Sequence, residues 1–129
     1  MKSTHLNLSI LPDMYAVCQM PSKASIPMWA TASSFYSVTQ TSDETSIVCE
    51  SKEVPAGVKA KLNWRMIKVE GHLDFSLTGI LASLTVPLAN AQISVFVVST
   101  FDTDYLLVQN ESFSKAVKVL RESGFTVNL

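Results

Sequence analysis

The stretch from Phe75 to Phe101 carries no charged residue, and it limits the possible folds of this 129-residue chain more than any other feature. It is long enough to raise the question of a membrane span. However, Pro87, Asn90 and Gln92 interrupt it, and its hydrophobic period changes from helical to alternating within it. Aspartates, rather than lysine or arginine, flank it. We therefore predict a buried helix followed by a buried strand.

The second half of the sequence predicts the element order βαββαβ. Strands are expected over residues 64–69, 93–98, 105–108 and 125–129. The run 93–98 is apolar at every position except Ser94, so it should be either central or covered on its second face. The short polar connection before residue 105 predicts a hairpin.

Two helices are expected between these strands. Asp74 or Ser76 can cap the first helix, and Pro87 should kink or end it because proline lacks a backbone donor. Ser112 can cap the second helix and Gly124 should stop it. The residues expected to face inward are Leu77, Ile80, Leu81, Leu84 and Leu88 in the first helix and Phe113, Ala116, Val117 and Leu120 in the second.

The first half reads as a weaker copy of the second. Strands are expected over residues 6–10, 15–20, 35–41 and 46–50, one or two helical turns over 28–34, and a connection over 52–63. Shifting the sequence by 59 residues lays Thr41 over Thr100 and Asp43 over Asp102, within matching strand–turn–strand patterns. A degenerate internal repeat explains this recurrence, and ordinary hairpin chemistry is the alternative.

These residues carry a family resemblance. GHLDFSLTGILASL (71–84) followed by ISVFVVSTFDTDYLLV (93–108) resembles the ACT domain of aspartate kinases, in the branch that contains short bacterial two-unit proteins and CASTOR-type arginine sensors. FYSVTQTSDETSIVCE (35–50) leading to Trp64 also fits that branch. The resemblance implies an α+β fold of two ferredoxin-like ACT units, a degenerate one over 1–61 and another over 62–129. It also implies antiparallel sheets with helices on one face.

The resemblance further implies a ligand site where ACT units meet. The loop that opens the first helix would hold the carboxylate of an amino acid, and the following strand and hairpin would hold its amino and side-chain groups. The implied site residues are Asp74, Phe75, Ser76, Leu77, Thr78, Gly79, Ile80, Ile93, Ser94, Val95, Ser99, Thr100, Asp102 and Asp104. The sequence departs from the family pattern at Gln92, where many relatives have glycine, and over 11–14, which lacks a glycine-bearing ligand loop.

Each of these features also has a plain structural interpretation. A helix start offers unpaired N–H groups to a carboxylate, but Asp74 or Ser76 could equally serve as a cap alone. Asp102 and Asp104 could attract an ammonium or guanidinium group, form a local turn, or bind a metal ion, although no histidine or third carboxylate stands nearby in the sequence. Cys18 and Cys49 fit buried free thiols, with a disulfide or a reactive thiol as alternatives.

Composition argues against several classes of function. The net charge is −1 and the basic residues are scattered, so neither nucleic acid nor an anionic membrane is an expected partner. His5 and His72 stand apart, and the common catalytic motifs are missing, which predicts a protein that is not an enzyme and needs no cofactor. The first residues have no sustained apolar core, and we expect a cytoplasmic protein.

The leading hypothesis is a small allosteric sensor of a free amino acid. The ligand would lie between ACT units, within one chain or across a homodimer, and a partner protein would respond to its binding. The rival hypothesis is a purely structural module that forms a homodimer without a ligand. The apolar strand over 93–98 suits both, because it needs cover on its second face.

Overall fold

The computed structural model describes residues 6–71 and 79–129, which form two compact units. The larger unit contains the residues up to Pro12 together with Arg65–Leu129, and the smaller unit contains Asp13–Trp64. A single boundary between residues 61 and 62 was predicted from the sequence. In the structure, the N-terminal strand instead groups with the C-terminal residues.

The larger unit is built on a mixed sheet. Its strands are β1 (Asn7–Ile10), the second half of β5 (Lys59–Val69), β6 (Phe96–Ser99), β7 (Asp104–Gln109) and β8 (Thr126–Asn128), in the order β6-β7-β5-β1-β8. The α+β class is confirmed, with one difference from the antiparallel sheet expected. Strand β1 is antiparallel to β5 but parallel to β8, because the N-terminal strand inserts between those two.

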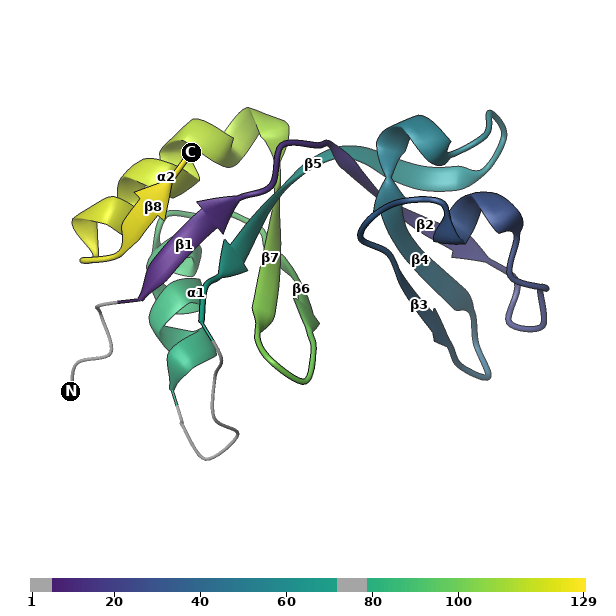
Figure 1. The fold of residues 1–129 in the computed structure, drawn as a ribbon, viewed down its shortest axis with the longest axis horizontal. Helices are drawn as coiled ribbons and strands as arrows, with labels where there is room; N and C mark the ends of the chain where they lie inside the picture. The colour runs from purple at the N-terminus through teal and green to yellow at the C-terminus, as the bar shows by residue number, and fades with distance from the viewer. Residues whose placement is uncertain (1–5, 72–78) are drawn as a thin grey trace. The chain divides into compact units, whose positions relative to one another are not determined.

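Two helices, α1 (Ile80–Asn90) and α2 (Phe113–Glu122), cover one face of this sheet (Figure 1). Alternate residues of a strand face the same side of a sheet, and Ile67 and Val69 of β5 share their core with Leu84 and Leu120 of the helices. The buried members of this core are Leu8, Ile67, Val69, Leu84, Leu88, Ile93, Leu106, Val108, Ala116, Val117, Leu120, Phe125 and Val127. The predicted inward faces are confirmed for Leu81, Leu84 and Leu88 of α1 and for all four predicted residues of α2, whereas Ile80 is only half-buried and is not part of this core.

Helix α1 departs from prediction at its beginning. Its first residue is Ile80 and its cap position is Gly79, so it begins after the predicted caps Asp74 and Ser76. At its other end the helix runs three residues beyond Pro87 and ends at Asn90, which agrees with the end predicted near the proline. The last turn persists because Leu88, one residue after the proline, is fully buried in the core.

The smaller unit is a sheet of order β3-β4-β2-β5, to which β5 contributes its first half. Its other strands are β2 (Tyr15–Met20), β3 (Ser37–Gln40) and β4 (Thr45–Glu50), and its helical residues form the 3₁₀ turns η1 (Met28–Thr31) and η2 (Ser51–Glu53). These strands and η1 confirm the sequence prediction closely. The connection predicted over 52–63 is wrong in its second part, because β5 already begins at Lys59.

The two units share a structural repeat. An offset of 59 residues carries β3, β4 and η2 onto β6, β7 and η3 (Asn110–Ser112) without any change of length. The turn geometry repeats as well: Thr41 N–H donates to the Glu44 carbonyl at 2.8 Å, and Thr100 N–H donates to the Thr103 carbonyl at 2.8 Å. The internal repeat predicted from the sequence is thus present in the backbone.

Candidate functional site

Part of the predicted site lies at one end of the larger unit, whereas Ile93, Ser94 and Val95 follow the C-terminal end of α1 and lie away from it. The end of β5, the beginning of α1 and the β6–β7 turn all lie at this end (Figure 1). Asp74, Phe75, Ser76, Leu77 and Thr78 lie outside the described residues. We refer to Gly79, Ile80 and the β6–β7 turn (residues 99–104) as the ligand end of the larger unit.

Gly79 sets the start of α1. Its φ of 76° lies in the left-handed region, which glycine adopts without steric cost. Helical backbone therefore begins only after it, at Ile80. The Gly79 carbonyl accepts the first helical hydrogen bond, from Ser83 N–H at 2.9 Å. Since glycine has no side chain, the residue at the cap position cannot bond to the first N–H groups of the helix. Such a helix start suits a carboxylate.

The β6–β7 turn is closed by its own polar side chains. The Thr100 hydroxyl donates to the Thr103 carbonyl at 3.0 Å and accepts from Thr103 N–H at 3.2 Å. The Ser99 hydroxyl donates to one carboxylate oxygen of Asp104 at 2.5 Å. Asp104 is half-buried, whereas Asp102 and the apolar Phe101 are exposed. The turn is therefore held by threonine and serine hydroxyls, and Asp104 takes part in it through Ser99.

A buried hydrogen bond ties this turn to the neighbouring strand. Thr103 is only 5% exposed, and its hydroxyl donates to the Val69 carbonyl, in the last residue of β5, at 2.6 Å. The chain segment that leaves β5 at Val69 is the one that reaches Gly79 and opens α1. The bond thus fixes the acidic turn beside the strand end that leads into the helix start. This bond is the firmest geometric link in the ligand end.

The strand after α1 contributes less than predicted. Ile93 is buried, and its N–H donates to the Leu88 carbonyl at 2.9 Å as part of the cap of α1. Val95 packs against the core, and Ser94 is exposed. The Ile93 amide is therefore already used within the protein, and of these three residues only Ser94 is exposed.

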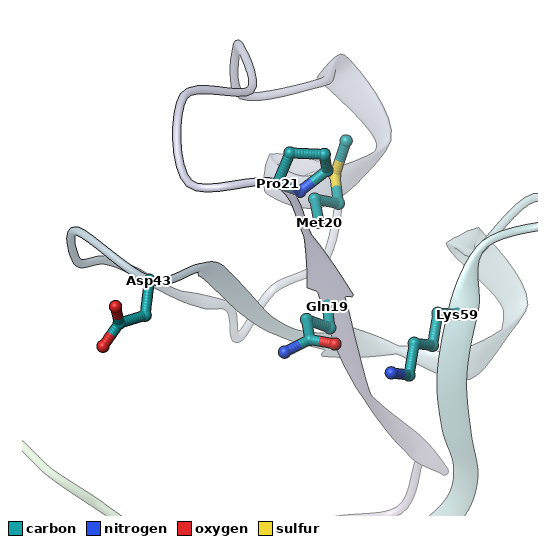
Figure 2. Close-up of a pocket in the computed structure, with 5 residues that line it drawn as sticks. All are labelled: Gln19, Met20, Pro21, Asp43 and Lys59. Carbon is teal, nitrogen blue, oxygen red and sulfur yellow. The ribbon is translucent and has the colours of Figure 1, made fainter.

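The sequence did not predict an open pocket that lies in the smaller unit. It has a volume of about 340 Å³, and Figure 2 shows its lining. The lining residues are Gln19, Met20, Pro21, Asp43 and Lys59. The repeat was the available signal, because Asp43 occupies the turn position that corresponds to Asp102. Gln19 and Lys59 could not be found this way, because strand pairing brings them together.

Comparison with known proteins identifies the family of the chain. The model of the ACT domain matches residues 59–122, and a model of an N-terminal domain matches residues 13–57. The crystal structure of protein Atu0741 from Agobacterium tumefaciens is 36% identical, with a TM-score of 0.91, over 95% of this chain and 92% of that one. The chain belongs to the ACT domain family. The resemblance stated from the sequence is confirmed.

This ACT protein also has relatives with named roles. The human cytosolic arginine sensor for mTORC1 subunit 1 is 39% identical over 59 residues, which are 45% of this chain and 18% of that protein. The chain therefore spans less than a fifth of the length of this relative. The ligand-free regulatory subunit of aspartate kinase from Thermus thermophilus shares the fold, with a TM-score of 0.60 at 9% identity, over 94% of this chain and 95% of that one.

Residues 6–71 and 79–129 of this ACT protein bear on metal binding and on membrane insertion. No group of three or more histidine, cysteine, aspartate or glutamate side chains there could hold a metal ion. Within the same ranges, no helix is long and apolar enough to cross a membrane. Cys18 and Cys49 are buried free thiols, as predicted.

Proposed function

We propose that this ACT protein is a small regulatory protein that binds a free amino acid at the ligand end of its larger unit. The observation that carries the proposal is the 2.6 Å hydrogen bond from Thr103 to the Val69 carbonyl. It holds an acidic turn next to the strand that leads into a helix start. One end of a zwitterion needs hydrogen-bond donors and the other needs acceptors, and these two elements supply both kinds.

The α-carboxylate of the ligand binds at the segment that opens α1. The first N–H groups of a helix lack intrahelical acceptors, and the helix dipole favours negative charge there. Gly79 has no heavy atom within 4 Å of the position that a Cβ would occupy, so ligand atoms can approach its backbone. We assign Asp74 to Ile80 to this half of the site, as the family resemblance implies.

The amino or basic group of the ligand binds at the β6–β7 turn. Ser99 holds one oxygen of Asp104, which orients the carboxylate and leaves its second oxygen for a cation. Asp102 adds a second negative charge two residues away. Each charge-assisted hydrogen bond contributes about 1.5–3 kcal/mol, so a few such contacts give micromolar to millimolar affinity.

Arginine is the first ligand to test. The arginine sensor relatives are named for that amino acid, and two aspartates at the turn suit a guanidinium group. The proposal includes a second copy of the chain that closes the site, and a protein partner that responds to closure. Phe101, which is 75% exposed at the tip of the turn, supplies an apolar contact for that copy.

Thermal unfolding in the presence of each common amino acid tests the proposal. A ligand at a hundred times its dissociation constant adds about 2.7 kcal/mol, which raises the midpoint by several degrees in a chain of this size. Asp104→Asn keeps an acceptor for the Ser99 hydroxyl but removes the charge, so it should abolish the shift and leave the ligand-free midpoint nearly unchanged. Glu111→Gln, a matched change at an exposed residue of the same unit, should retain the shift.

One observation favours the alternative of a homodimer without a ligand. Strand β6 lies at an edge, since within the described residues it pairs with β7 alone, and Phe96, Val97 and Val98 are only half-buried. An exposed apolar edge of this kind invites pairing with another chain. If no amino acid moves the unfolding midpoint while the chain sediments as a dimer, this alternative replaces the sensor.

A further inference from the structure

We propose that the smaller unit has a binding site of its own, for an elongated zwitterion such as a basic amino acid or a short peptide, in the pocket between Asp43 and Lys59. This site is separate from the one proposed in the larger unit and does not depend on it. Three observations carry it: opposite charges on the two sides of the pocket, a fixed amide between them, and the repeat of the acidic turn.

The charges lie on the two sides of β2. Lys59 of β5 is the register partner of Gln19 of β2, so the two side chains share one face of the sheet. Asp43 lies in the turn that leads into β4, the strand on the other side of β2. In Figure 2, Asp43 and Lys59 lie on opposite sides of Gln19, and the ammonium group of Lys59 points toward Gln19.

Gln19 has a defined amide orientation. Its Nε2 donates to Oε1 of Glu44 at 3.0 Å, on the Asp43 side of the pocket. Its Oε1 consequently faces the Lys59 side and is available as an acceptor in the floor of the pocket. A ligand carboxylate at Lys59 and a ligand cation at Asp43 would therefore lie across an amide that is already oriented.

The spacing selects the length of the ligand. Adjacent strands lie about 4.8 Å apart, so β4 and β5 lie roughly 10 Å from each other across β2. Asp43 lies in the turn before β4, beyond Ser46, the register partner of Gln19, so its carboxylate is not closer to Lys59 than this strand spacing suggests. A zwitterion whose charges are separated by a single carbon cannot reach both groups. A chain of several bonds between the charges can do so, and a pocket of about 340 Å³ has room for it.

The repeat gives this pocket a structural counterpart in the larger unit. Asp43 and Asp102 occupy the same position of the same turn, in which Thr41 and Thr100 make equivalent hydrogen bonds. The chain thus presents an acidic turn twice. In the smaller unit, the pocket beside this turn is also lined by a cation, Lys59.

Titrations of the full-length chain, followed by amide chemical shifts, test the site. The probes are 6-aminohexanoate, which carries opposite charges at its two ends, and glycine, hexanoate and hexylamine, which each lack one feature of it. We expect 6-aminohexanoate to shift the amides of Gln19 and Lys59 saturably, and each other probe to bind at least tenfold more weakly. Raising the salt concentration should weaken binding, because the charges are exposed.

Variants make the test specific. Lys59→Gln and Asp43→Asn each remove one charge-assisted contact and should raise the dissociation constant about tenfold or more. Lys115→Gln, at an exposed lysine in α2, and Asp104→Asn, in the larger unit, should leave it unchanged. Saturable binding that survives Lys59→Gln, or that is lost with Asp104→Asn, would overturn the proposal, as would 6-aminohexanoate binding no better than glycine. None of these results depends on whether an amino acid binds the larger unit.

Discussion

At the scale of single residues, both helices end in the same backbone motif with different residues at its key position. After α2, Gly124 has φ 102°, its N–H donates to the Arg121 carbonyl, and the next N–H donates to Leu120. After α1, Gln92 has φ 62°, and its N–H and that of Ile93 make the equivalent bonds. This is the Schellman cap, whose left-handed residue is usually glycine. The motif explains why the family pattern has glycine where this chain has Gln92.

Gln92→Gly should therefore stabilise the protein. A residue with a side chain is strained in the left-handed region, and the expected gain from relieving that strain is about 1 kcal/mol in the free energy of unfolding. Denaturant unfolding measures this gain directly. Gly124→Gln, the reverse change at the equivalent position of α2, is the matched control and should lower stability. A loss of stability in Gln92→Gly would show that this side chain makes a contact worth more than the strain.

The two cysteines should be unreactive in the folded protein. Cys18 and Cys49 are at most 1% exposed, and the hydrogen bond with Cys18, followed by burial, raises the pKa of the Cys49 thiol. Reaction requires an accessible thiolate. Because its raised pKa keeps the buried Cys49 thiol protonated, its labelling should not become faster between pH 7 and pH 9. Colorimetric labelling should therefore be slow across this range and become fast for both thiols in denaturant. Fast labelling of the native chain would contradict their burial.

At the scale of elements, the contact between the β6–β7 turn and β5 is the one that shapes the ligand end. Thr103→Val keeps the shape of the side chain but leaves the buried Val69 carbonyl without its hydroxyl donor. We expect a loss of about 1–3 kcal/mol in the free energy of unfolding and a weaker response to the amino acid. Thr103→Ser retains the hydroxyl and should keep the response. Equal responses in the valine and serine variants would remove this contact from the proposed mechanism.

Periodicity and turn chemistry were enough to predict most elements from the sequence. The strand over residues 15–20 and the apolar spacing of Ala116, Val117 and Leu120 could be predicted from local sequence, and the structure confirms both. The beginning of β5 was missed because its lysines, Lys59 and Lys61, are exposed and resemble a linker. The end of α1 near Pro87 was predicted from the missing backbone donor of proline, and burial of Leu88 accounts for the last turn beyond it.

Of the two candidate sites, one could be predicted from local sequence and the other could not. The ligand end could be proposed from the sequence because its segments follow one another closely in the second half and match a known pattern. The pocket of the smaller unit could not, because the pairing of Gln19 with Lys59 depends on strand register between segments far apart in the sequence. Asp43 alone was recognisable, through the repeat.

At the scale of the whole molecule, the N-terminal strand belongs to the larger unit. Leu8 is fully buried and pairs with Val69 on one side and Val127 on the other. A truncated chain of residues 62–129 would lose this strand from the middle of its sheet and expose the edges of β5 and β8. We expect that chain not to fold by circular dichroism, and Leu8→Ala in the full chain to cost about 2–5 kcal/mol. A cooperatively unfolding 62–129 would instead support the single boundary expected from the sequence.

The central claim is that a free amino acid binds at the ligand end of the larger unit. The most direct measurement is a crystal structure of the full chain grown with saturating L-arginine, or with whichever amino acid raises the unfolding midpoint. We predict electron density for the ligand with its carboxylate at the segment that opens α1 and its cationic group at Asp104. Density at another place, or an empty ligand end at saturating concentration, would contradict the account.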